Sequence, residues 1–109
     1  MLSRKEFDLL INTVPDNLIS ETMHSENEKG EIVFCSVGWI ATRLGIDWGE
    51  RESPDVYGFL EPKLGISWIG LRALTIQNDR LEQEERKEHL KYWLKSLKTL
   101  WWGKESESV

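Results

Sequence analysis

The chain has 109 residues, of which 39% are hydrophobic and 30% are charged, and its formal net charge is −5. This length fits one domain, and the composition is neither that of a disordered chain nor that of a membrane protein. A single cysteine excludes a disulfide framework, and the negative net charge disfavours phosphate binding, which needs clustered lysine and arginine.

The same features predict where the protein works. No hydrophobic run approaches the ~20 residues that a membrane-spanning helix needs. No signal peptide precedes the first charged residues, Arg4 and Lys5, and the lone Cys35 agrees with a reducing cytosol. We therefore expect a cytoplasmic protein with one globular domain over residues 1–104 and a disordered tail over 105–109.

The first predicted element is a helix over residues 4–13. Ser3 and Glu6 have the spacing of a capping box at its start. Its apolar face recurs at helical spacing and consists of Phe7, Leu10, Ile11 and Val14. Pro15 ends the run because it disfavours a helical conformation at the preceding residue. Residues 18–35 then predict a small β-hairpin, with a turn at 26–30 and a second strand over 31–35.

Two short helices are predicted next. Ser36 begins the first, whose apolar face consists of Val37, Ile40, Ala41 and Leu44. Gly45 stands where a left-handed C-terminal cap is needed. Ser53 and Pro54 have the pattern of a helix start, and Pro62 is predicted to interrupt that second helix.

Two longer helices complete the chain. A helix over 67–77, capped by Ser67, is apolar around most of its circumference and is therefore expected to be central and buried. Asn78 and Asp79 are predicted to form a corner, because asparagine tolerates the left-handed conformation that ends a helix and aspartate caps the next one. The last helix spans about 80–102, and Gly103 ends it. Its predicted apolar stripe consists of Leu90, Trp93, Leu94, Leu97, Leu100 and Trp101. The fold class is mainly α (α+β), a compact bundle of four to five helices with one small β-hairpin around residues 18–35.

The charge is unevenly distributed along the chain. Residues 1–50 hold 9 acidic and 4 basic side chains, whereas acids and bases balance in residues 51–78 and in residues 79–109. This acidic half predicts either a negative surface that attracts a basic partner protein or an ordinary solubilising surface.

Candidate chemistry is sparse. Cys35 lies where a strand gives way to a helix, so a helix N-terminus could activate its thiol, with His24 or His89 as a base. The alternative is a small buried residue at a tight packing point, which Gly38 three residues later supports. No spacing of histidine and cysteine suits a metal, no phosphate-binding loop is present, and the 67–77 helix offers only Arg72 for DNA. We therefore expect no catalytic residue, no cofactor, no metal and no direct reading of nucleic acid.

The aromatic end of the last helix has three interpretations. Lysines on one side and Trp and Leu on the other are typical of a core helix with a solvated face, of an anchor for a partner protein, or of a helix in a membrane interface. Trp101 and Trp102 point about 100° apart, so one of them is expected at the edge of the apolar stripe. Trp48 lies in a charged loop, where it either folds back over the core or serves recognition. The predicted interface residues are Trp48, Trp93, Lys98, Trp101 and Trp102.

Part of the chain resembles a known group of proteins. The run Phe34-Cys35-Ser36-Val37-Gly38-Trp39-Ile40-Ala41-Thr42-Arg43-Leu44-Gly45, followed by Leu64-Gly65-Ile66, Leu71, Leu74, Asn78 and Asp79, resembles small phage and prophage proteins. These proteins have a Cys-x-x-Gly helix that ends in Leu-Gly and a later Asn-Asp pair. The group brings no assigned activity; the resemblance implies a phage or mobile-element setting in a bacterial host. It also implies structural roles for Cys35, Gly38, Gly45, Asn78 and Asp79. The chain departs from the pattern after Asp79, where its last helix is longer.

These observations favour a non-enzymatic interaction protein of a phage or mobile element. It is expected to bind and modulate, most simply to inhibit, a host or phage protein such as a bacterial defence component. Two alternatives stay open, namely a small thiol-dependent enzyme using Cys35 and a self-associating structural protein whose 80–102 helix pairs in a homodimer.

Overall fold

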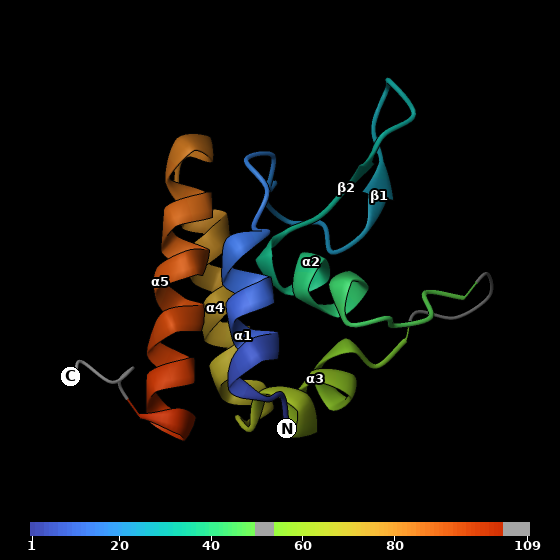
Figure 1. The fold of residues 1–109 in the computed structure, drawn as a ribbon. Coiled ribbons are helices and arrows are strands. Elements are labelled where there is room, and N and C mark those ends of the chain that lie inside the picture. Colours follow the sequence, from blue (N-terminus) through green and yellow to red (C-terminus); the bar gives the residue numbers. More distant parts are fainter. Residues whose placement is uncertain (50–53, 104–109) are drawn as a thin grey trace.

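The computed structural model describes residues 1–49 and 54–103 (Figure 1). In these residues it has five helices and one two-stranded sheet, in the order α1 (Arg4–Asn12), β1 (Ser25–Glu26), β2 (Ile32–Val33), α2 (Ser36–Arg43), α3 (Val56–Leu64), α4 (Trp68–Arg80) and α5 (Gln83–Trp102). The predicted helical bundle with a small hairpin is confirmed. The predicted tail over 105–109 and the predicted cap at Ser53 lie outside the described residues.

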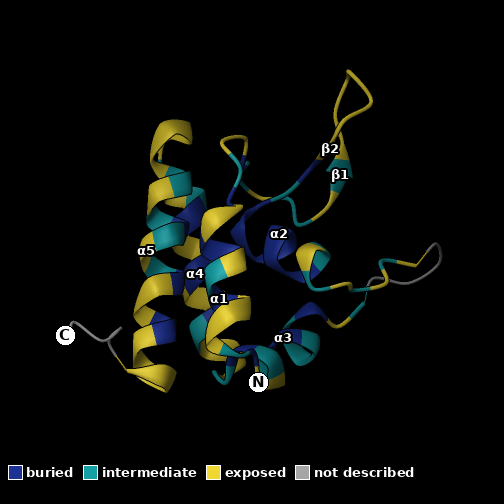
Figure 2. Cartoon of the chain, viewed as in Figure 1, coloured by how far each residue is buried: buried dark blue, intermediate teal, exposed yellow. Residues whose placement is uncertain are grey.

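The helices pack into one bundle around a shared core. α1 and α5 lie side by side, and α4 lies behind them in contact with α5, α2 and α3 (Figure 1). The hairpin projects from one end of the bundle, opposite the end at which the N-terminus and the last turn of α5 lie (Figure 1). Buried residues follow the facing sides of the helices, whereas residues on their outer sides are mostly exposed (Figure 2).

α1 forms as its sequence predicts. The Ser3 hydroxyl accepts a hydrogen bond from the Glu6 N–H at 3.1 Å, and the Glu6 carboxylate accepts one from the Ser3 N–H at 2.9 Å. This capping box holds the first turn, and the hydrogen bonds from Ser3 lower the pKa of the Glu6 carboxyl. All members of the predicted apolar face are buried, namely Phe7, Leu10, Ile11 and Val14.

The hairpin is short and antiparallel, with Ser25 opposite Val33 and Glu26 opposite Ile32. The Asn27 side chain organises its turn by accepting hydrogen bonds from the Lys29 and Glu31 N–H groups, both at 2.9 Å. The Cys35 N–H also donates to the Thr22 carbonyl at 2.8 Å, so the two arms stay linked beyond the strands. The hairpin predicted around residues 18–35 is thus confirmed, with strands of two residues each.

The two middle helices differ in how well they were predicted. α2 begins at Ser36 as expected, and Gly45 beyond its end has a φ of +91°, in the left-handed region. The prediction that Pro54 is the first residue of the next helix is wrong, because Asp55 is the N-cap and α3 begins at Val56. The prediction that Pro62 interrupts this helix is also wrong, since α3 continues through Pro62 to Leu64. Burial of residues on both sides of the proline, Leu60 and Leu64, offsets the hydrogen bond that it cannot donate.

The prediction that the fourth helix is central and buried is also wrong. Only one side of α4 is covered, and its buried residues are Leu71, Leu74 and Asn78. Trp68, Ile69 and Ile76 are 51%, 63% and 40% exposed. α4 therefore lies at the surface of the bundle with a second apolar face directed outward.

Asn78 and Asp79 do not form the predicted corner, since α4 continues to Arg80 and the chain turns at Leu81 and Glu82. Asn78 is fully buried inside the helix. Its amide oxygen accepts from the Ser36 hydroxyl at 2.7 Å, and its amide nitrogen donates to the Ile19 carbonyl at 2.8 Å. The pair has a structural role through side-chain hydrogen bonds to distant segments, and the capping role assigned to it is wrong.

Asp79 extends this polar network to the loop before the hairpin. Its carboxylate accepts a hydrogen bond from the Glu21 N–H at 2.8 Å. Glu21 has a φ of +63°, a conformation that residues with a Cβ rarely adopt, and the bond to Asp79 helps to hold it there. The Arg86 guanidinium completes the network by donating to the Asn78 carbonyl at 2.9 Å and to the Leu18 carbonyl at 3.3 Å.

Candidate functional site

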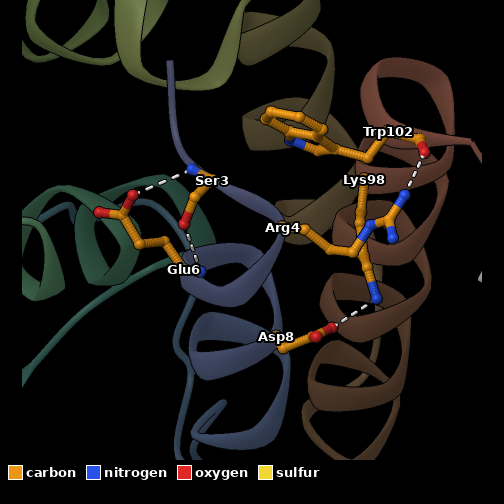
Figure 3. Close-up of polar contacts among 6 residues, drawn as sticks. All are labelled: Ser3, Arg4, Glu6, Asp8, Lys98 and Trp102. Atoms are coloured by element: carbon orange, nitrogen blue, oxygen red, sulfur yellow. Dashed lines mark hydrogen bonds and ion pairs between the residues drawn. The ribbon is translucent and has the colours of Figure 1, made fainter.

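The last turn of α5 is fixed to the N-terminal segment by hydrogen bonds to the backbone. Arg4 Nη2 donates to the Trp102 carbonyl at 2.6 Å (Figure 3). The Trp102 indole N–H donates to the Leu2 carbonyl at 3.1 Å. The Leu2 N–H donates in turn to the Lys63 carbonyl at 2.7 Å, near the end of α3. Three segments far apart in the sequence therefore meet at this end of the bundle.

Trp101 packs at the same place against the turn that follows α3. A Cβ atom built at Gly65 would lie 2.8 Å from Met1 Sδ and 2.8 Å from Trp101 Cε2. Gly65 has a φ of +71° and caps α3 in the left-handed conformation, so glycine suits both the turn and the close approach.

Four large apolar side chains at this end stay partly in solvent. Met1 is 58% exposed, Leu100 69%, Trp101 42% and Trp102 40%. We call these four residues the apolar end. The sequence predicted that one of Trp101 and Trp102 lies at the boundary between core and solvent. In the structure both do, because each ring packs against the protein on one side and faces solvent on the other.

The apolar end has the properties of a recognition surface for a protein. Tryptophan dominates the binding energy of many protein interfaces, and an exposed apolar cluster is often an interaction site. The hydrogen bonds of Arg4 and Trp102 hold the last turn of α5 before any partner arrives, which reduces the entropy lost on binding.

Lys98 does not lie on a solvated face, and its assignment to an exposed interface is wrong. It is 7% exposed, and its Nζ lies 2.6 Å from Asp8 Oδ1 on α1 (Figure 3). The pair links α1 to α5, so Lys98 stabilises the bundle instead of meeting a partner. Trp93 is half-buried and packs against the core.

An open groove follows the α1–α5 junction beside this ion pair. Its volume is about 480 Å³, and it is lined by Asp8, Ile11, Asn12, Lys95, Lys98, Thr99 and Gly103. The groove has a mixed polar and apolar lining and two lysines.

Trp48 folds back onto the protein, one of the two alternatives that its loop position allowed. Its indole N–H donates to the Thr42 hydroxyl on α2 at 2.9 Å. Its ring stacks on His24 with the ring centres 4.7 Å apart. These contacts belong to α2 and the segment before β1, so the structure does not bring Trp48 together with the tryptophans of α5.

Cys35 has the environment of a structural residue. It is buried and serves as N-cap of α2, where its sulfur accepts from the Gly38 N–H at 3.5 Å. Burial raises the pKa of the Cys35 thiol, which favours the unreactive protonated form at neutral pH. Among the described residues no hydrogen bond joins this sulfur to His24 or His89, and burial lowers the pKa of His89.

We expect slow alkylation of Cys35 in the native protein. Iodoacetamide near neutral pH should label the folded chain at least roughly tenfold more slowly than the same chain in denaturant, because the thiol is covered and protonated. Mass spectrometry over time measures both rates. Equal rates would contradict the structural role.

The described residues contain no group of three or more His, Cys, Asp and Glu that could hold a metal ion. None of the helices within 1–49 and 54–103 combines the length and the hydropathy needed to cross a membrane. The chain matches no protein-family model, no curated protein and no solved structure. The interpretation of its function therefore depends on the geometry described above.

Sequence reasoning missed part of the candidate site. The sequence carried no signal that Leu2 and Arg4 act at the end of α5, because their partner there, Trp102, lies about a hundred residues away. The same holds for Met1, which meets Trp101 at Gly65. Gly65 did carry a sequence signal, since a glycine after a helix predicts a left-handed cap. This signal does not identify the side chains that pack against the glycine.

Proposed function

We propose that the chain is a non-enzymatic protein that binds a partner protein through the apolar end and thereby modulates, most simply inhibits, that partner. The observation that carries the proposal is the pair of partly exposed tryptophans, Trp101 and Trp102, on a helix end fixed by backbone hydrogen bonds. An inhibitor needs only a rigid surface that covers a site on its target, and this surface requires no catalytic group.

The setting is part of the same proposal. The resemblance of residues 34–79 to small phage and prophage proteins supports a role in the cytoplasm of a bacterial host, with a host or phage protein as target. A component of bacterial defence is a suitable candidate, since a small protein that blocks such a component needs no activity of its own. The acidic N-terminal half supports a target that has a basic surface beside its apolar site.

Leu100 offers a sharp test because it is largely exposed and its replacement should not disturb folding. We expect Leu100→Glu to lose the partner that the wild-type chain captures from lysate of its host cells, since a buried unpaired carboxylate is costly at an interface. Quantitative mass spectrometry of captured proteins gives the measurement.

Leu9→Glu is the matched control, because Leu9 is 57% exposed on α1 and lies outside the apolar end. The control should capture the same partner as wild type. If Leu100→Glu captures it equally well, the apolar end is not the binding surface and the proposal fails.

Self-association is the second candidate, and exposed Tyr92 and Leu100 on α5 favour it. Sedimentation of the wild-type chain at high micromolar concentration distinguishes the two. If the chain is a monomer at this concentration, a homodimer through the 80–102 helix is excluded. If it is a dimer and Leu100→Glu dissociates it, self-association and not binding of a partner protein is the function of the apolar end. A thiol-dependent enzyme is the least favoured function, because Cys35 is buried and its pKa is raised.

A further inference from the structure

The outer side of α4 carries an apolar stripe that no described element covers. Ile69, Ala73 and Ile76 follow the i, i+4, i+7 spacing of one helix face, and all three are exposed. The buried residues Leu71 and Leu74 lie on the other side of the same helix. α4 is therefore apolar on two faces, of which the bundle uses one.

The charges beside this stripe have one sign. Arg72 lies next to it, and Arg80 extends it by one further turn. Both are exposed, and neither forms an ion pair with a described residue. Asp79, the acid in α4, is turned toward the loop before the hairpin, where its carboxylate accepts the Glu21 N–H. On a chain of net charge −5, the outer face of α4 thus combines isoleucines with unpaired cations.

A second copy of the chain does not complement this face. A two-fold axis through the centre of the stripe would place Arg72 close to Arg72 of the other copy, with no acid on the stripe to compensate. Like charges at such a contact oppose association. The occupant that fits supplies a row of apolar side chains flanked by carboxylates.

We propose that the outer face of α4, formed by Ile69, Arg72, Ala73, Ile76 and Arg80, binds an acidic amphipathic helix of a partner protein. Leucine-sized side chains of that helix pack between the two isoleucines, and its flanking Asp or Glu residues pair with the two arginines. This surface shares no residue with the apolar end, so the chain has the means to contact two segments of one partner or two partners at once.

Three helical peptides test the proposal. Each has about 18 residues, roughly five helical turns, with the same leucine face; the positions beside the leucines are Glu, Gln or Lys. We expect the Glu peptide to bind the full chain about tenfold more tightly than the Lys peptide, with the Gln peptide between them. Calorimetry measures the affinities, and amide chemical shifts should change along α4.

Charge reversal provides the decisive variant. Arg72→Glu combined with Arg80→Glu should reverse the order of the peptides, while Lys91→Glu combined with Lys95→Glu, the same change of net charge on α5, should leave it unaltered. Leu100→Glu should bind the three peptides with the same affinities as wild type. The failure of this proposal can therefore be distinguished from the failure of the proposal about the apolar end.

Several results would overturn the proposal. Equal affinities for the three peptides, no binding of any of them, or an equal effect of the α5 control would each exclude charge-selective docking on α4. A wild-type dimer in sedimentation that Ile76→Asp dissociates would show that a second copy occupies the face, which also overturns it.

Discussion

Replacing Gly38 with alanine should lower the free energy of unfolding by about 3 kcal/mol or more, enough to unfold a marginally stable domain. Gly38 is buried in α2, and a Cβ atom there would overlap the carbonyl group of Met23. Because the obstacle is backbone, either α2 or the segment before β1 must move. The gain in helix propensity, about 1 kcal/mol, does not compensate. Urea or thermal unfolding followed by circular dichroism measures the change.

Gly70→Ala is the matched control, since Gly70 also lies in a helix. A Cβ atom there would meet Ile66 Cδ1 at 2.6 Å, the far end of a flexible side chain that can rotate away. We expect this variant to change the free energy of unfolding by less than about 1 kcal/mol in either direction. If the two alanine substitutions change the free energy of unfolding equally, α2 does not approach the Met23 backbone as closely as described.

Asn78→Ala should destabilise the fold by about 3 kcal/mol. The substitution removes the hydrogen-bond partners of the Ser36 hydroxyl and the Ile19 carbonyl, and it leaves a cavity where a fully buried side chain stood. An unpaired buried polar group costs about 1–3 kcal/mol, and the two losses occur at one site. The same unfolding measurement gives the effect.

Two comparisons make this prediction specific. Gln77→Ala alters the neighbouring exposed residue of the same helix and should change stability by less than about 0.5 kcal/mol. Ser36→Ala removes one of the three hydrogen bonds of the Asn78 side chain, so its loss of stability should lie between those of the other two variants. If Asn78→Ala costs no more than Gln77→Ala, the buried network does not hold α4 to the loops.

Local signals predicted the starts of helices and the buried faces well. The pair Ser3 and Glu6 determines where α1 begins, because a capping box depends on residues three apart. The glycine at position 45 likewise indicated a chain reversal that needs a left-handed conformation. These features are encoded within one or two turns of chain, which is the range over which a sequence pattern is informative.

The errors share a physical cause, namely contacts between distant segments. The apolar circumference of α4 suggested a central helix, but periodicity shows only which residues share a face and not whether a neighbour covers that face. The local sequence at Asn78 predicts a helix end, because its actual hydrogen-bond partners, Ser36 and Ile19, are far away in sequence and leave no local pattern. Lys98 was placed in solvent because Asp8, which neutralises it, lies on the first helix.

The candidate site was predictable only in part. A tryptophan pair near the end of the chain indicated that one ring would lie at a boundary, and the structure places both rings there. The segment that completes the site, from Met1 to Arg4, is joined to α5 by hydrogen bonds between residues about a hundred positions apart. No spacing rule connects the two ends of the chain, so the sequence could not place them together.

The pairing of α1 with α5 has a consequence for how the protein is made. Ribosomes synthesise α1 first and α5 last, and α1 packs mainly on α5. The side of α1 that carries buried Ile11, which lines the α1–α5 junction, therefore remains without its main helical neighbour until α5 has been synthesised. During that interval the nascent chain exposes an apolar helix face. We expect chaperones that bind newly made chains to cover this face until α5 packs on it.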